Sequence, residues 1–189
     1  MILKTLIFFA ILLFTLVGCS SSQSTTEKRD VSLSTLYHKT EKANLFYKLP
    51  KGWTEIKDNY EQLFELWLVG PKNNSTITFV PIQFENDLNE MNSSNQLQKL
   101  LNVKTNIKKA SLKNFIVVEK LKEFENNNIK FGSMEYLDNS NAKRSVIFGK
   151  GNSYFECIAY FENDYKPTKI ELKNLFDIQQ LVLLSIQMK

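Results

Sequence analysis

Polar and apolar residues alternate with a period of two in several segments after residue 44, and this pattern predicts β-strands. The segments lie at residues 44–49, 62–70, 75–84, 113–123, 128–137, 143–148 and 153–161. Turn-forming sequences separate them, including PKNN, NNN, DNSN and GKGN. Residues 31–40 are ambiguous, because their apolar positions fit either a short docking turn or a strand.

Two further segments have the spacing of amphipathic helices. In residues 93–110 the apolar positions that recur at this spacing are Leu97, Leu100, Leu101 and Ile107. Ser93 or Ser94 is the expected N-cap of this helix, and a second stripe runs from residue 172 to residue 186. A strand, a hairpin, a helix, an antiparallel meander and a closing helix predict an α+β fold, with an antiparallel sheet and helices packed on its faces.

The N-terminal segment has a different pattern. Lys4 precedes an apolar run, Leu6–Val17, that is interrupted only by Thr15. Such a run is too short to cross a bilayer, which needs about 20 residues, but it fits the apolar region of a secretory signal. Leu16-Val-Gly-Cys19 resembles the bacterial lipobox, in which the cysteine thiol receives a diacylglyceryl group and becomes the mature N-terminus. An ordinary cleaved signal and an uncleaved anchor are the alternatives.

The expected organisation is therefore a signal peptide over residues 1–18, an acylated Cys19 with a tether over 19–30, and one α+β domain over 31–189. Residues 20–30 contain no apolar side chain, so they predict a flexible tether with an end-to-end distance of about 18 Å. Acyl chains bury about 0.8 kcal/mol per methylene, enough to anchor a protein that does not span the bilayer.

Ser20 bears on which membrane holds the anchor. In Gram-negative lipoproteins, which this region resembles, an aspartate at this position often retains the protein in the inner membrane. Serine favours the outer membrane, with the domain facing the periplasm. The inner membrane and a Gram-positive cell surface are the alternatives.

Two stretches resemble known families. Residues 45–53, with FYKLPKGW as their core, resemble the strand and Pro-Gly-Trp turn that open many PsbP-like α/β/α sandwich domains. Residues 145–149, the strand at 154–160 and the final Leu-Leu-Ser-Ile resemble the last third of DcrB-type bacterial lipoproteins. The resemblance covers most of the layout of residues 44–187 and implies a small envelope lipoprotein of PsbP-like fold with an assembly or accessory role. It carries no catalytic or ligand motif onto this chain.

Composition excludes some classes of function. The net charge is only +4, and lysines and glutamates are interspersed, whereas nucleic-acid-binding domains concentrate basic residues in patches. We therefore expect no nucleic-acid partner. If Cys19 is acylated, Cys157 has no disulfide partner, so the fold depends on its core, for which 14 Phe, 7 Tyr and 2 Trp are available.

Candidate chemistry is sparse. His38 is the only histidine and lies beside the tether, where nothing nearby could orient it as a base, so we interpret it as exposed and idle. Cys157 shares one strand face with Phe155, Ala159 and Phe161, while Tyr154, Glu156, Tyr160 and Glu162 lie on the other. We therefore expect Cys157 in the core, with a raised thiol pKa, and not as a nucleophile.

Metal and phosphate sites are not expected either. One histidine and one free cysteine cannot complete a zinc site. The tract from Glu85 to Glu90, with Asp87 and Asn89, lacks the spacing and glycine of an EF-hand, and Gly149-Lys-Gly151 is a hairpin turn. The sequence predicts no cofactor. The lysines of the first helix could face anionic headgroups, but we interpret them as its solvated side: Lys99, Lys104, Lys108, Lys109 and Lys113.

We therefore expect a lipoprotein without enzymatic activity, whose partners are the bilayer, through Cys19, and an envelope protein bound by the folded surface. The alternative is a small-ligand or hydrolytic activity in a cleft of the sandwich. The side chains that discriminate between the two are Tyr47, Trp53, Tyr60, Trp67, Tyr136 and Tyr154. Their convergence on a deep pocket with an acid would favour the alternative.

Overall fold

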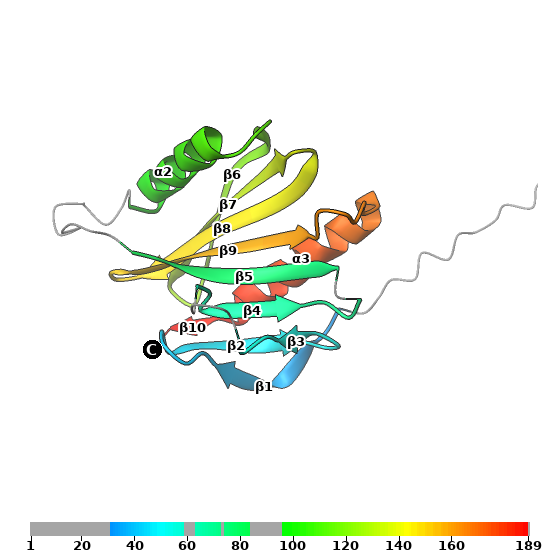
Figure 1. Cartoon of the computed structure of the whole chain (residues 1–189). Coiled ribbons are helices and arrows are strands. Elements are labelled where there is room, and N and C mark those ends of the chain that lie inside the picture. Colours follow the sequence, from blue (N-terminus) through cyan, green and yellow to red (C-terminus); the bar gives the residue numbers. More distant parts are fainter. Residues whose placement is uncertain (1–30, 59–62, 73, 84–95, 189) are drawn as a thin grey trace, which may run out of the picture. The chain divides into compact units, whose positions relative to one another are not determined.

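The predicted strands form two antiparallel sheets in the computed structural model, which describes residues 31–58, 63–72, 74–83 and 96–188 (Figure 1). The larger sheet contains, in spatial order, β3 (Thr54–Glu55), β4 (Leu66–Val69), β5 (Ser75–Ile82), β9 (Ser153–Phe161), β8 (Asn141–Lys150), β7 (Ile129–Asp138) and β6 (Ile116–Asn126). The smaller sheet has the order β1 (Leu33–Lys39), β2 (Leu45–Pro50) and β10 (Gln187–Met188).

Strands β6 to β9 form the predicted antiparallel meander, and β5 pairs with β9 over its whole length. The first two hairpin turns of the meander place Asn127 and Asn128, then Asn139 and Ser140, at positive φ. Tight two-residue turns of this kind match the twist of the flanking strands. The turn signals in NNN and DNSN therefore correspond to real turns.

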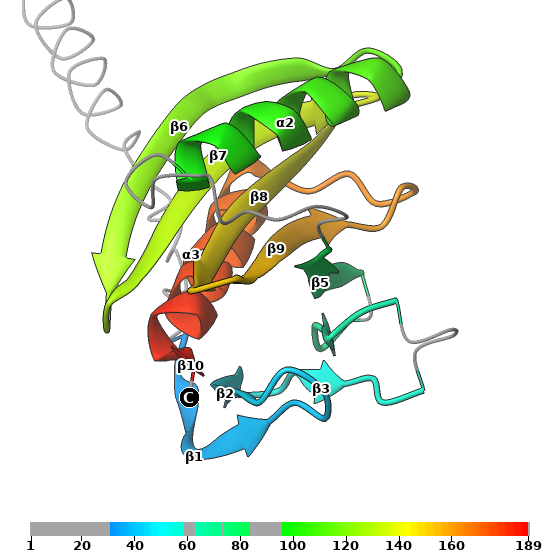
Figure 2. The ribbon, with the colours of Figure 1, turned by 90° about the vertical axis from the view of Figure 1, so that its left-hand side faces the viewer.

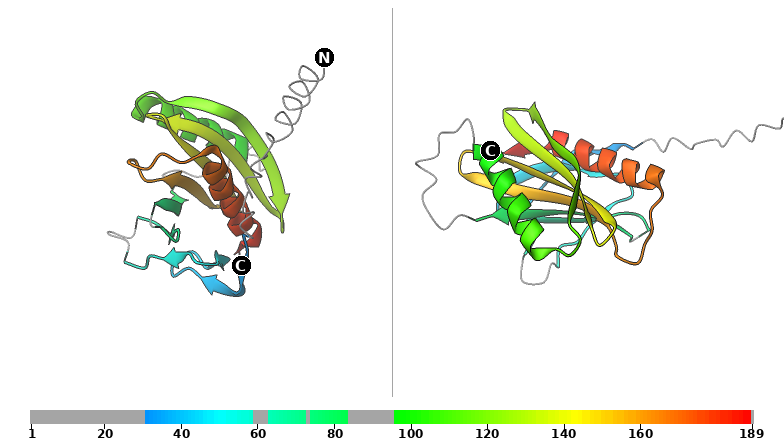
Figure 3. Two further views of the ribbon diagram at one scale, coloured as in Figure 1. Left: turned by 90° about the vertical axis from the view of Figure 1, so that its right-hand side faces the viewer. Right: turned by 90° about the horizontal axis from the view of Figure 1, so that it is seen from above.

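The helices α2 (Gln96–Ser111) and α3 (Lys169–Ser185) lie on opposite faces of the larger sheet (Figures 2 and 3). Thr168 caps α3, because its side chain accepts a hydrogen bond from the Glu171 amide while the Glu171 side chain accepts one from the Thr168 amide. This reciprocal pair satisfies two amides that a helix otherwise leaves unpaired. α2 packs on the sheet through Leu97, Leu100 and Leu101.

The main core lies between α3, the larger sheet and the smaller sheet. It includes Leu45 and Tyr47 of β2, Phe79 of β5, Phe148 of β8 and Leu183 of α3, each inaccessible to solvent. The aromatic rings of Phe131, Phe148 and Phe155 stack across neighbouring strands. The ring centroids of Phe131 and Phe148 are 5.6 Å apart, and those of Phe148 and Phe155 are 5.5 Å apart. The chain from Val31 onward thus forms one compact unit with its own core.

The structure resolves the ambiguous segment and adds elements that the pattern did not predict. Residues 33–39 form strand β1 and not a docking turn. The two-residue strands β3 and β10 are too short to have a period, and the division into two sheets was not predicted. Ser93 and Ser94, the candidate N-caps, lie outside the described residues.

Candidate functional site

An open pocket of about 290 Å³ lies between the second half of α2 and the face of the sheet beneath it. We call it the α2 pocket, and its walls are Lys104, Ile107, Lys108, Ser111 and Leu112 of α2 and the segment after it, with Tyr136, Asp138, Lys143, Glu156, Ile158 and Tyr160 of strands β7 to β9. The period of two places these strand residues on the face that α2 covers. The pocket therefore combines aliphatic, aromatic and charged side chains.

Glu156 is the centre of the polar network in this pocket. Its side chain is almost fully buried, and its carboxylate lies 2.9 Å from Lys108 Nζ and 3.2 Å from Lys104 Nζ. The Ser145 hydroxyl donates a hydrogen bond of 2.6 Å to the same carboxylate. Lys104 and Lys108 are four residues apart, so one helix face carries both to the same acid. Glu156 thereby joins α2 to β8 and β9.

These contacts determine the charge state of Glu156. Burial by itself raises the pKa of its carboxyl group, but Lys108, Ser145 and Lys104 together outweigh burial and hold this pKa below its ordinary value. A carboxylate that is ionised and occupied by three donors is a weak base. Glu156 therefore suits a structural role better than general acid or base catalysis.

A second ion pair also lines the α2 pocket. Lys143 Nζ lies 2.8 Å from Asp138 Oδ2 and 5.5 Å from the ring centroid of Tyr160. Lys108 Nζ lies 5.1 Å from the centroid of the buried Tyr136 ring. Burial, together with the negative charges of Glu156 and Asp138, raises the pKa of the Tyr136 phenol. The pocket thus presents ammonium groups and neutral phenols, which suit binding by hydrogen bonds and ring contacts.

Cys157 lies on the other face of β9, as the sequence predicted. It is a free thiol, fully buried, and burial strongly raises its pKa. The side-chain amide of Gln179 in α3 donates hydrogen bonds to the Cys157 carbonyl oxygen at 3.1 Å and to Sγ at 3.3 Å. Arg144 of β8 donates a hydrogen bond of 3.2 Å to the Phe176 carbonyl oxygen and another to Gln180 Oε1. This network joins α3 to the sheet and does not line the α2 pocket.

The remaining sequence candidates do not come together. His38 lies in β1 and is partly buried, with its ring 5.6 Å from that of Tyr47, so its interpretation as an exposed side chain is wrong. Cys19 and the tract from Glu85 to Glu90 lie outside the described residues. Within the described part of the chain, no group of three or more His, Cys, Asp or Glu side chains is placed to hold a metal ion.

The lysines in and just after α2 were interpreted as the solvated side of the helix, and this is wrong for two of them. Lys104 and Lys108 point toward the sheet and pair with Glu156, whereas Lys99, Lys109 and Lys113 are exposed. The signal was present in the sequence, because positions 104 and 108 continue the helical stripe of Leu97, Leu100 and Leu101. Ile107, assigned to that stripe, is instead 54% exposed at the pocket.

The discriminating aromatic side chains are dispersed. Tyr47 and Trp53 belong to the main core, and Tyr154 donates a hydrogen bond of 2.8 Å to Gln96 at the start of α2. Trp67 borders a separate cavity of about 60 Å³, and Tyr60 lies outside the described residues. Of this set, Tyr136 alone lines the α2 pocket. None of the described helices is long and apolar enough to cross a membrane.

No protein family matches the sequence, and no curated relative matches it. The solved structures that are similar in fold include the following two. The solution structure of cyanobacterial PsbP from Synechocystis sp. PCC 6803 superimposes with a TM-score of 0.54 at 9% identity, over 93% of this chain and 99% of that one. LpqN of Mycobacterium tuberculosis, described as involved in cell envelope biogenesis, gives 0.50 at 11% identity, over 86% of this chain and 87% of that one. The chain therefore has the PsbP-like fold that the resemblance implied, an α+β domain with antiparallel sheets and a helix on each face of the larger one.

Proposed function

We propose that this protein is a lipid-anchored protein of the bacterial cell envelope, and that it acts by binding another envelope component through its folded surface and not by catalysis. Leu16-Val-Gly-Cys19 supports the anchor, and Ser20 supports the outer membrane with the domain in the periplasm. The involvement of LpqN in cell envelope biogenesis supports the envelope assignment. A DcrB-type accessory role belongs to the same proposal.

The observation that carries the binding role is the paired state of the polar groups in the α2 pocket. Lys104 and Lys108 are held by Glu156, and Lys143 is held by Asp138. The thiol of Cys157 is buried on the opposite face of the strand. A nucleophile or base needs an available lone pair near the substrate, whereas a binding surface needs fixed donors and apolar area. Ile107 and Tyr160 supply apolar area next to the fixed charges.

Binding of a small ligand is a second candidate, and the size of the pocket favours it. About 290 Å³ is close to the lower limit of pockets that enclose small molecules. Tyr136 and Tyr160 could contact an apolar or aromatic ligand there, and Lys143 could orient its polar end. The protein-binding role differs from this one in requiring exposed side chains around the pocket, such as Ile107.

Mass spectrometry of the mature protein tests the anchor. The expected N-terminus is a diacylglyceryl-modified Cys19, and Cys19→Ser should leave an unprocessed precursor. An unmodified N-terminus, or cleavage at another residue, would refute this part of the proposal.

Complementation of a deletion strain tests the binding role. We expect a secreted, unlipidated form and an Ile107→Glu variant to lose most function. Alanine substitutions at His38, Cys157, Asp87 and Glu90 should retain it at equal protein abundance. If one of these four substitutions abolishes function in a folded protein while the unlipidated form stays active, a catalytic or ligand site must be sought around that residue.

A further inference from the structure

The outward face of strands β1 and β2 carries an ordered set of aromatic and basic side chains. In the antiparallel register Tyr37 lies opposite Lys48, and Lys39 lies opposite Phe46. All four point away from the core, because the neighbouring position Tyr47 points into it. Lys48 Nζ lies 4.9 Å from the Tyr37 ring centroid, and Lys39 Nζ lies 5.9 Å from that of Phe46. We call these four residues, together with the adjacent exposed Leu36, the β1 face.

The β1 face combines basic side chains with exposed apolar ones. Strands β1, β2 and β10 contain no acidic residue, whereas strands β3, β6, β7 and β9 of the larger sheet do. Leu36, which falls within the irregular register between Leu33 and Tyr37, is 74% exposed, and Tyr37 is 45% exposed. A positively charged face that leaves a leucine and a tyrosine in water has the composition of a membrane-interface surface.

The position of the β1 face relative to the proposed anchor fits this composition. The described unit begins at Val31, two residues before β1. Only eleven residues, 20–30, separate Cys19 from Val31. An acylated Cys19 would therefore keep the start of β1 near the bilayer.

The geometry points to the β1 face as the surface that rests on the anionic bilayer in which Cys19 is anchored, and this inference depends on the proposed anchor. Leu36 and Tyr37 enter the headgroup region, and Lys39 and Lys48 contact lipid phosphates. The smaller sheet and α2 lie at opposite ends of the domain in two perpendicular views (Figures 1 and 2). A domain resting on the β1 face therefore turns the α2 pocket away from the membrane, toward a partner.

The lysines of α2 are a weaker surface for lipid. Lys104 and Lys108 already neutralise Glu156, and Asp138 neutralises Lys143 at the same end of the domain. Lys39 and Lys48, by contrast, contact aromatic rings and leave their charge uncompensated by an acid in their own sheet. Charge complementarity with anionic lipid therefore favours the β1 face.

The test uses the unlipidated protein that begins at Ser20, whose described unit has its own core, and vesicles with or without phosphatidylglycerol in phosphatidylcholine. An environment-sensitive dye is attached to Leu36→Cys or, as a control, to Val118→Cys, which is 61% exposed on the far edge strand β6. The buried Cys157 leaves the introduced thiol as the accessible one. We expect a blue shift at position 36 that needs phosphatidylglycerol, and no shift at position 118.

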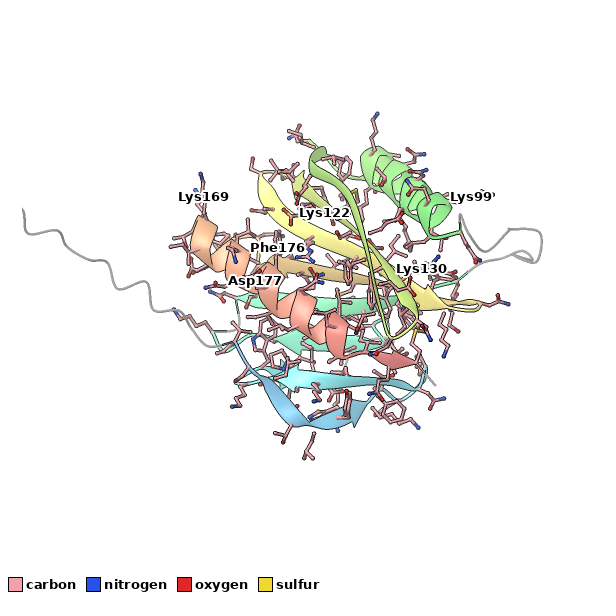
Figure 4. All side chains as sticks on the ribbon, turned by 180° about the vertical axis from the view of Figure 1, so that it is seen from behind. Lys99, Lys122, Lys130, Lys169, Phe176 and Asp177 are labelled. Atoms are coloured by element: carbon pink, nitrogen blue, oxygen red, sulfur yellow. The ribbon has the colours of Figure 1, made fainter. Side chains whose placement is uncertain are left out.

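Charge variants give the second readout. Each lysine near an anionic surface contributes on the order of five-fold in affinity, so Lys39→Gln with Lys48→Gln should weaken vesicle binding by on the order of 25-fold. The matched control is Lys99→Gln with Lys169→Gln, which removes the same charge from exposed sites away from β1 (Figure 4). This control should change binding by less than about two-fold, since distant charges are screened.

The inference would be overturned by equal losses of vesicle affinity in the two double-lysine variants, by a dye shift at position 118, or by no binding to phosphatidylglycerol vesicles. Because the protein tested has no acyl chain, these results do not depend on the modification of Cys19. If Cys19 is lipidated but the dye at position 36 does not respond to vesicles, the proposed function stands and the proposed orientation is wrong. If Cys19 is unmodified, the proposed anchor is wrong, whatever the vesicle experiment shows.

Discussion

Glu156 of β9 and Lys108 of α2 form an ion pair of 2.9 Å that holds the second half of the helix on the sheet. The first half packs through leucines against Ile147, but beyond Leu101 the helix presents Lys104 and Lys108 to the sheet in place of apolar side chains. The long lysine chains cover apolar surface while their ammonium groups reach the buried acid. The shape of the α2 pocket therefore depends on one carboxylate.

Replacing Glu156 with glutamine should destabilise the domain by about 3 kcal/mol, because it leaves two largely buried ammonium groups without their counter-charge. Unfolding in urea, followed by circular dichroism, measures the change. The matched control is Glu125→Gln, which removes an exposed carboxylate on β6 and should cost less than about 0.5 kcal/mol. Equal effects of the two substitutions would contradict the role of Glu156.

The Glu156 carboxylate should also make the free energy of unfolding depend on pH. The folded-state pKa of Glu156 lies below its ordinary value of 4.5, so the unfolded state binds the proton more readily. Its contribution is fully present above about pH 4.5 and is lost as the pH falls through the lower folded-state pKa. The free energy of unfolding of the wild type should therefore fall more steeply under acid conditions than that of Glu156→Gln. Parallel curves for the two proteins would show that another group is responsible.

Gly132 of β7 lies under α2 at a close approach. A Cβ atom at this position would lie 2.3 Å from Leu101 Cδ1 and 3.3 Å from its Cγ. Gly132→Ala should therefore displace Leu101 and cost about 1 to 3 kcal/mol. In the background of Leu101→Ala the same substitution should cost far less, since the clashing atoms are gone. Additive effects in this double-mutant cycle, measured by urea unfolding, would rule out the contact.

Cys157 should react slowly with thiol reagents in the native protein and rapidly in denaturant. Its side chain is inaccessible and burial strongly raises its pKa, so both access and the thiolate population are low. The test is the rate of reaction with a colorimetric disulfide reagent in the Cys19→Ser background, with and without denaturant. Rapid labelling of the folded protein would place the thiol at the surface.

The sequence predicts the strands of the meander and the faces of β9 well, because the period of two is strong there. Phe155, Cys157 and Ala159 face the core and Glu156 faces the other side, as expected. The two-residue strands β3 and β10 are set by pairing with β4 and β2. Such pairing depends on tertiary contacts between distant segments and leaves no local pattern.

The candidate site could be predicted only in part. Lysines in a helix are usually solvated, so residue type alone predicted that Lys104 and Lys108 face water. Their helical spacing, however, places them on the face that packs against the sheet. The burial of Glu156 on the facing strand was the missing observation, because a buried carboxylate requires a counter-charge. The pair of Lys143 and Asp138 could not be predicted in the same way. It depends on the tight turn that brings the start of β8 beside the end of β7.

Crosslinking in intact cells tests the central claim most directly, that the protein acts by binding through the surface around the α2 pocket. A photoreactive amino acid is placed at Ile107, which is 54% exposed beside the pocket, or at Ile170, which is 57% exposed on α3. We predict one envelope-protein adduct of defined mass from position 107, lost when Lys143→Glu is added, and none from position 170. The same adduct from both positions, or an adduct from position 170 alone, would contradict the account.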